Sequence, residues 1–170
     1  MQEYFTLFSL PECYAIDQAK LEAAYRQVQA QVHPDRFAHR PEAERRVAMQ
    51  WATLANEAFR TLRNPLDRAR YLLDRRGAAV DPERNVGMSP AFLMQQMAWR
   101  EEVEAAAGDA QALLRLQRDL ARDERVMTDD LARALDESGD LPLAGELVRR
   151  LMFMDKLRRE IRDALEQLED

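Results

Sequence analysis

The sequence has few of the residues that stabilise secreted or strand-rich proteins. Cys13 is its only cysteine, so the chain cannot form an internal disulfide, and the reducing cytoplasm is the expected location. Five glycines and seven prolines in 170 residues are too few for a Gly/Pro-rich disordered chain or a β-sandwich with many tight turns. No apolar run approaches the roughly 20 residues that span a bilayer, and the opening MQEYF lacks the pattern of a secretory signal. We therefore expect no membrane association.

The sequence also lacks a surplus of positive charge and the usual metal-binding clusters. Its formal net charge is -6, which argues against general nucleic-acid binding, because that needs Lys and Arg to displace phosphate counterions. There is no CxxC or HxxxH cluster, so neither a metal nor a cofactor is expected. Cys13 has no histidine near it in the sequence and is better interpreted as a packed residue than as a nucleophile. We expect no catalytic residue.

What the chain does contain is typical of an all-α protein. Ala, Leu, Glu, Arg and Gln dominate, which are strong helix formers, whereas Val/Ile/Thr runs are missing. Two turn-rich segments, HPDRFAHRP (33–41) and GAAVDPERNVGMSP (77–90), interrupt the helical pattern. The second is long for a loop inside a compact domain. We therefore predict one domain over residues 1–76, a connection over 77–88 and a second domain over 89–170.

The first domain is predicted to contain an antiparallel helical hairpin and short helices. Asp17 can cap a helix that ends near Val32, because Pro34 disfavours a helical residue before it. The second helix is expected to have Pro41 at its first position and to end at Asn64-Pro65, before a short third helix. The expected packing stripes are Leu21, Tyr25, Val28 and Val32 on the first helix, and Val47, Trp51, Leu54, Ala55, Ala58 and Leu62 on the second.

The second domain is predicted to be an antiparallel three-helix bundle, with Ser89 and Asp140 as caps. Its first helix carries two apolar rows, although one row is enough to pack a bundle. Phe92, Trp99 and Val103 form one row, and the surplus row contains Leu93, Met94 and Met97. The surplus row is either a partner-binding face, which flexible methionines suit, or a sign that the helix is buried on two sides.

The tripeptide His33-Pro34-Asp35 lies between the two hairpin helices, and there the sequence resembles a J-domain. The resemblance also rests on the aromatic segment YFTLF, on Tyr25 and on the pattern of LANEAFRTLRNPLDRARYLL (54–73). It implies that the turn docks on a DnaK-type chaperone. Proline ends the helix so that Asp35 is presented to a partner cation, and His33 can donate from its ring. The expected chaperone-binding residues are His33, Pro34, Asp35, Arg36, Arg26 and Gln29.

Over nearly its whole length the chain resembles the HscB family, in which a J-domain is joined to a three-helix bundle. The matching segments are YFTLF, HPDRF, NPLDRARYLL, AFLMQQ and MFMDKLR. The resemblance implies a non-enzymatic co-chaperone that brings the iron–sulfur scaffold protein IscU to an HscA-like chaperone and stimulates its ATP hydrolysis. The scaffold-binding patch would then contain Leu93, Met94, Met97, Glu101 and Phe153, and the chain is expected to be a monomer.

Two other functions remain open from the sequence. The bundle could be a dimerisation module of a J-protein that has no iron–sulfur client. Alternatively, His33, Asp35 and His39 could be the ligands of a metal-dependent hydrolase, although three groups from one loop form a poor cage.

Overall fold

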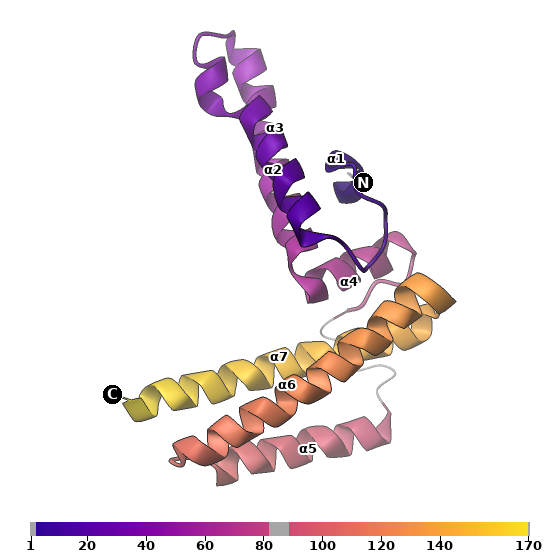
Figure 1. The fold of residues 1–170 in the computed structure, drawn as a ribbon, viewed down its shortest axis with the longest axis vertical. Helices are drawn as coiled ribbons and strands as arrows, with labels where there is room; N and C mark the ends of the chain where they lie inside the picture. The colour runs from indigo at the N-terminus through magenta and orange to yellow at the C-terminus, as the bar shows by residue number, and fades with distance from the viewer. Residues whose placement is uncertain (1–2, 82–88, 170) are drawn as a thin grey trace. The chain divides into compact units, whose positions relative to one another are not determined.

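The computed structural model describes residues 3–81 and 89–169 and divides them between two compact units, Met1–Leu72 and Leu73–Asp170 (Figure 1). The described residues are mostly helical and contain no strand, which confirms the all-α prediction. Among them, no helix combines the length and the apolarity needed to cross a bilayer. Of the predicted connection over 77–88, residues 82–88 lie outside the described part of the chain.

The first unit is built on a hairpin of two helices that lie side by side (Figure 1). A short helix, α1, packs against the second helix of the hairpin. A 3₁₀ turn over Pro34–Phe37 forms the connection of the hairpin. The helices are α1 (Tyr4–Leu7), α2 (Gln18–Val32), α3 (Glu42–Arg63) and α4 (Pro65–Arg75), which ends beyond the division between the units.

Local capping explains where these helices begin. The Asp17 carboxylate accepts the backbone N–H groups of Ala19 and Lys20, which confirms it as the cap of α2. Asn64 caps α4 in the same way, with its side-chain oxygen 2.9 Å from the N–H of Leu66. Pro41 was expected at the first helical position of α3, but it is the cap residue, with an extended ψ of 151°.

The packing stripe of α3 is only partly as predicted. Ala55, Ala58 and Leu62 are buried, whereas Val47 and Trp51 remain 51% and 47% exposed. α3 has 22 residues and α2 has 15, and the two are aligned at the end where the Gln18 amide reaches the Arg63 carbonyl. α3 therefore extends past the end of α2, and its first turns lie beside the 3₁₀ turn rather than beside a helix.

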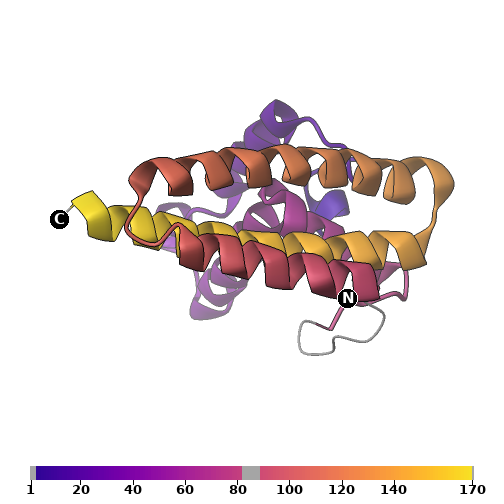
Figure 2. The ribbon, with the colours of Figure 1, turned by 90° about the horizontal axis from the view of Figure 1, so that it is seen from below.

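The second unit is the predicted three-helix bundle, whose helices run alongside one another (Figure 2). Ser89 and Asp140 cap helices as expected, and Gly139 provides the left-handed residue (φ 65°) between the last two. Its core contains Phe92, Trp99, Met154 and several leucines such as Leu113. The helices are α5 (Pro90–Ala105), α6 (Ala110–Arg133, followed by a π turn over Ala134–Ser138) and α7 (Leu141–Glu169).

Candidate functional site

The turn after α2 is an exposed structure held by its own polar groups. The His33 ring nitrogen Nδ1 accepts a hydrogen bond from the backbone N–H of Asp35 at 3.3 Å. In a neutral ring the proton is then on Nε2, which takes no part in this contact. The same nitrogen lies 3.5 Å from the Asp35 carboxylate, a distance at which a protonated ring would form an ion pair. The Asp35 side chain is 90% exposed, so its carboxylate is available to a cation on another molecule.

Arg36 has a structural role that the sequence did not reveal. The carbonyl of Ala30 would normally accept the N–H of residue 34, but that residue is Pro34, which has none. The Arg36 guanidinium donates to this carbonyl at 2.8 Å. The proline that ends α2 and the arginine that follows it therefore act together to complete the last turn.

The other two expected chaperone-binding residues differ in their surroundings. Arg26 is exposed on α2. Gln29 is half-buried and faces α3, where its amide nitrogen lies 2.6 Å from the side-chain oxygen of Asn56. The Tyr25 hydroxyl donates to the same oxygen at 2.8 Å. Asn56 belongs to the J-domain-like pattern in the sequence, but the pattern gave no indication of this contact.

In the second unit, α5 separates its two apolar rows as the spacing predicted. Phe92 and Trp99 are buried against α7, whereas Leu93, Met94 and Met97 are 41%, 72% and 63% exposed. These three residues, called the α5 patch below, are within one or two turns of one another. No described helix of the second unit covers this row.

Phe153 connects the α5 patch helix to α7 through a cluster of three aromatic rings. Its ring stacks on Trp99 with the centroids 6.1 Å apart and meets the edge of Phe92 at the same distance. The Arg100 guanidinium lies 5.8 Å from the Phe153 ring centre, and Arg150 lies 4.8 Å from that of Phe92. Phe153 is half-buried in this cluster, so it supports α5 as well as showing a part of its ring to solvent.

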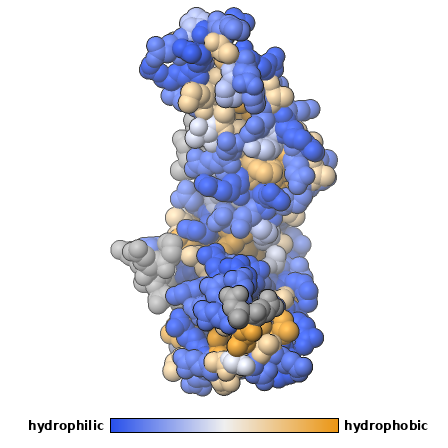
Figure 3. All heavy atoms as spheres, turned by 90° about the vertical axis from the view of Figure 1, so that its left-hand side faces the viewer, coloured by the Kyte–Doolittle hydropathy of each residue, from blue (hydrophilic) through white to orange (hydrophobic). Residues whose placement is uncertain are grey.

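Glu101 is exposed one turn beyond Met97, at the spacing that extends the row formed by Leu93 and Met97. Figure 3 shows that hydrophobic side chains gather in a few places on a surface that is otherwise mainly hydrophilic. An exposed apolar row with an acidic end is a suitable surface for a protein partner that offers apolar and basic side chains.

Other groups in the described structure do not form an active site. Among the described residues, no three His, Cys, Asp or Glu side chains are arranged to hold a metal ion, and this includes His33, Asp35 and His39. The Cys13 thiol donates to the carbonyl of Ala15 at 3.0 Å. Burial and the neighbouring Asp155 carboxylate raise the pKa of Glu124 on α6, although Arg158 opposes this.

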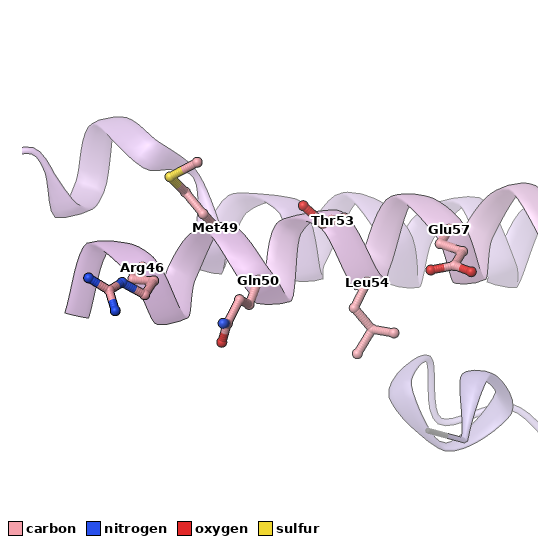
Figure 4. A pocket seen from close by; sticks show the side chains of 6 residues that line it. All are labelled: Arg46, Met49, Gln50, Thr53, Leu54 and Glu57. Atoms are coloured by element: carbon pink, nitrogen blue, oxygen red, sulfur yellow. The ribbon is translucent and has the colours of Figure 1, made fainter. Parts of the chain in front are cut away.

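A shallow hollow lies on the face of α3 that points away from α2 (Figure 4). Arg46, at one end, pairs with Glu42 at 3.3 Å. At the other end, burial and a hydrogen bond to Glu57 raise the pKa of the Tyr4 hydroxyl. The lining residues are Arg46, Met49, Gln50, Thr53, Leu54 and Glu57. Its two charged ends are already partnered, so the hollow offers no acid–base pair for chemistry.

Comparison with known proteins agrees with this arrangement. Residues 88–162 match the family described as "HSCB C-terminal oligomerisation domain". The chain is 52% identical to the "Co-chaperone protein HscB homolog" of Aromatoleum aromaticum, and 53% identical to that of an Azoarcus species. The alignments cover 99% of this chain in both cases, and 96% and 97% of the relatives.

Solved structures give the same result. The chaperone HscB from Vibrio cholerae superposes with a TM-score of 0.87 at 34% identity, and covers 98% of this chain and 99% of its own. Human co-chaperone protein HscB superposes with a TM-score of 0.91 at 28% identity, over 100% of this chain and 84% of its own. The Jac1 co-chaperone from Saccharomyces cerevisiae, at 21% identity and a TM-score of 0.75, shares the fold.

Proposed function

Because this chain belongs to the HscB family of co-chaperones, we propose that it brings an iron–sulfur scaffold protein of the IscU type to a DnaK-type, HscA-like chaperone in the cytoplasm. The 33–36 turn docks on the chaperone and stimulates its ATP hydrolysis. The bundle holds the scaffold protein. The chain itself supplies no catalytic group, because ATP is hydrolysed in the chaperone.

One observation supports this proposal above the others: each unit exposes its own motif. The Asp35 carboxylate is almost fully exposed on the first unit, and Met94 and Met97 are largely exposed on the second. A polar turn suits a charged docking site, whereas flexible thioethers suit an apolar protein surface. When one chain holds both partners, the local concentration of each partner near the other rises, and this favours transfer between them.

The α5 patch would grip the scaffold protein mainly through apolar contact. Leu93, Met94 and Met97 provide that contact, Glu101 provides an acidic rim, and Phe153 provides a rigid base for the helix. A few side chains near the centre of an interface, desolvated on binding, usually carry most of its binding energy. The cluster that the scaffold carries is cargo, so it needs no ligand from this chain.

Binding calorimetry with purified scaffold protein tests the proposal. We expect the double variant Leu93→Ala/Met97→Ala to bind about 10- to 100-fold more weakly than wild type, which corresponds to roughly 1.4–2.7 kcal/mol. Leu114→Ala, which shortens a leucine that is 46% exposed on α6, is the matched control and should bind normally. Unchanged binding by a folded double variant would remove the α5 patch from the proposal.

A second candidate is self-association through the same patch. The family description of residues 88–162 as an oligomerisation domain favours it, whereas the proposal above expects a monomer. Sedimentation of the chain alone at micromolar concentration separates the two. A dimer that the Leu93→Ala/Met97→Ala variant dissociates would mean that the patch binds a second copy rather than a scaffold protein.

A further inference from the structure

The C-terminal half of α2, which carries Arg26 and leads into the 33–36 turn, has little hydrophobic anchoring. In α2, all of whose residues are described, Leu21 is the only buried side chain. Val28 and Val32 are half-buried. Burial of apolar area is the main force that fixes a helix on its neighbour, so this half of α2 needs another attachment.

That attachment is a small polar network between α2 and α3, centred on Asn56. The side-chain oxygen of Asn56 accepts the Tyr25 hydroxyl at 2.8 Å and the Gln29 amide at 2.6 Å. The Gln29 amide also donates to the Tyr25 hydroxyl oxygen at 2.5 Å, which closes a triangle. Both lone pairs of one acceptor are thus used by two residues that lie one helical turn apart.

The network is held in place at its base by aromatic contacts. The Tyr25 ring stacks on Phe59 of α3 with the centroids 4.1 Å apart, and the Phe8 ring meets its edge. Tyr25, Gln29 and His33 follow at intervals of four residues, so the network and the turn lie along one side of α2. A rotation or shift of the last turns of α2 would break the network and would move His33 with it.

We infer that Asn56 is a positioning residue for chaperone docking: as a double hydrogen-bond acceptor it fixes the last two turns of α2, and therefore the 33–36 turn, in the orientation that the chaperone binds. This inference rests on the proposed function of the turn. Without the acceptor, α2 occupies the competent orientation for only a fraction of the time. The apparent affinity is then the intrinsic affinity multiplied by that fraction, while the bound complex remains fully active.

The substitution Asn56→Leu removes the acceptor, whereas Asn56→Asp keeps an acceptor oxygen on a side chain of nearly the same shape. Gln50→Leu, on the exposed side of α3, is the matched control for replacing an amide by leucine. We expect Asn56→Leu to raise the co-chaperone concentration that half-maximally stimulates chaperone ATPase by at least about fivefold, with little change in the plateau. Asn56→Asp and Gln50→Leu should stay near wild type.

Amide hydrogen exchange of the full chain, without any partner, gives an independent readout. Asn56→Leu should speed exchange in residues 28–33 while leaving the C-terminal bundle unchanged, and Asn56→Asp should restore slow exchange. If Asn56→Leu fails to fold, Tyr25→Phe, which removes one donor and keeps the ring stack, should show the same affinity loss to a smaller degree.

The outcomes are distinguishable. A wild-type half-maximal concentration in folded Asn56→Leu would overturn the inference and leave the proposed function intact. A loss that Asn56→Asp shares would overturn it too, because the acceptor would then not be the cause. Failure of the wild-type chain to stimulate any DnaK-type chaperone would overturn the proposed function and the inference together.

Discussion

The guanidinium of Arg36 lies 2.8 Å from the carbonyl oxygen of Ala30, six residues earlier, and replaces the hydrogen bond that Pro34 cannot make. This contact shows why an arginine suits the position after the His-Pro-Asp motif. Proline breaks the helix so that Asp35 projects, and the arginine satisfies the acceptor left by the break. The side chain can do so because it folds back to the end of α2, where it remains exposed.

Loss of this contact should have a measurable but modest cost. We expect Arg36→Ala to lower the free energy of unfolding by roughly 0.5–1.5 kcal/mol, the usual net value of one hydrogen bond. Arg40→Ala in the same loop, where Arg40 is exposed, is the control and should change stability less. Denaturant unfolding of the full chain measures both.

A double-mutant cycle tests whether Arg36 compensates for the N–H group that Pro34 lacks. Pro34 also disfavours a helical His33, whose ψ is 132°. In Pro34→Ala, His33 can become helical and the new backbone N–H can then bond to the Ala30 carbonyl, so the guanidinium is no longer needed. The cost of Arg36→Ala should therefore shrink towards zero in the Pro34→Ala background. An equal cost in both backgrounds would show that Arg36 stabilises the turn in some other way.

Phe153 should matter to stability more than its partial exposure suggests, because it stacks on Trp99 and Phe92. We expect Phe153→Ala to lower the free energy of unfolding by about 2 kcal/mol, less than the 3–5 kcal/mol of a fully buried phenylalanine. Phe153→Leu should recover about half of that loss. Thermal unfolding followed by near-ultraviolet circular dichroism, which reports on the packing of Trp99, is the measurement.

A cost below about 0.5 kcal/mol for Phe153→Ala would contradict a supporting role for the ring. Scaffold binding by Phe153→Leu separates the two roles of this residue. If the ring only supports α5, the leucine variant binds almost normally, whereas a large loss would indicate direct contact with the partner.

Glu124 should make stability depend on pH. Burial and the Asp155 carboxylate raise its pKa above the ordinary value of 4.5, although Arg158 opposes them. The folded state thus holds the proton more tightly than the unfolded state, so its contribution to stability is present below pH 4.5 and is lost as the pH rises through the raised pKa. Glu124→Gln removes this titration.

Urea unfolding between pH 4 and pH 7 is the measurement. The stability of Glu124→Gln relative to wild type should increase as the pH rises through this range. Glu137→Gln, at an exposed carboxylate in the π turn, is the control and should give a difference that changes less with pH. A Glu124→Gln difference that falls with rising pH would mean that the pairing with Arg158 outweighs burial.

Features governed by local rules were predicted from the sequence. The caps Asp17, Ser89 and Asp140 need only a side-chain oxygen next to a helix start, and each lies where it was expected. The placement of Phe92 and Trp99 on one row of α5, and of Leu93 and Met97 on another, follows from the 3.6-residue period alone.

Features that depend on the partner helix were not predicted. Periodicity indicates the face on which Val47 and Trp51 lie, but it cannot show that α3 extends past α2 and leaves that part of the face half exposed. In the same way, the sequence does not show that Gln29 faces α3. Its contact with Asn56 depends on the register of the hairpin, which the sequence of one helix does not contain.

The most direct test of the account is the steady-state ATPase rate of the purified HscA-like chaperone, measured with scaffold protein present and absent. The wild-type chain and the scaffold protein together should raise the ATPase rate by more than the sum of the increases that each gives alone. His33→Gln should abolish stimulation while His39→Gln, in the same exposed loop, should not. Leu93→Ala/Met97→Ala should keep the scaffold-independent stimulation and lose the additional effect of scaffold. Full stimulation by folded His33→Gln, or an undiminished scaffold effect in the double variant, would contradict the account.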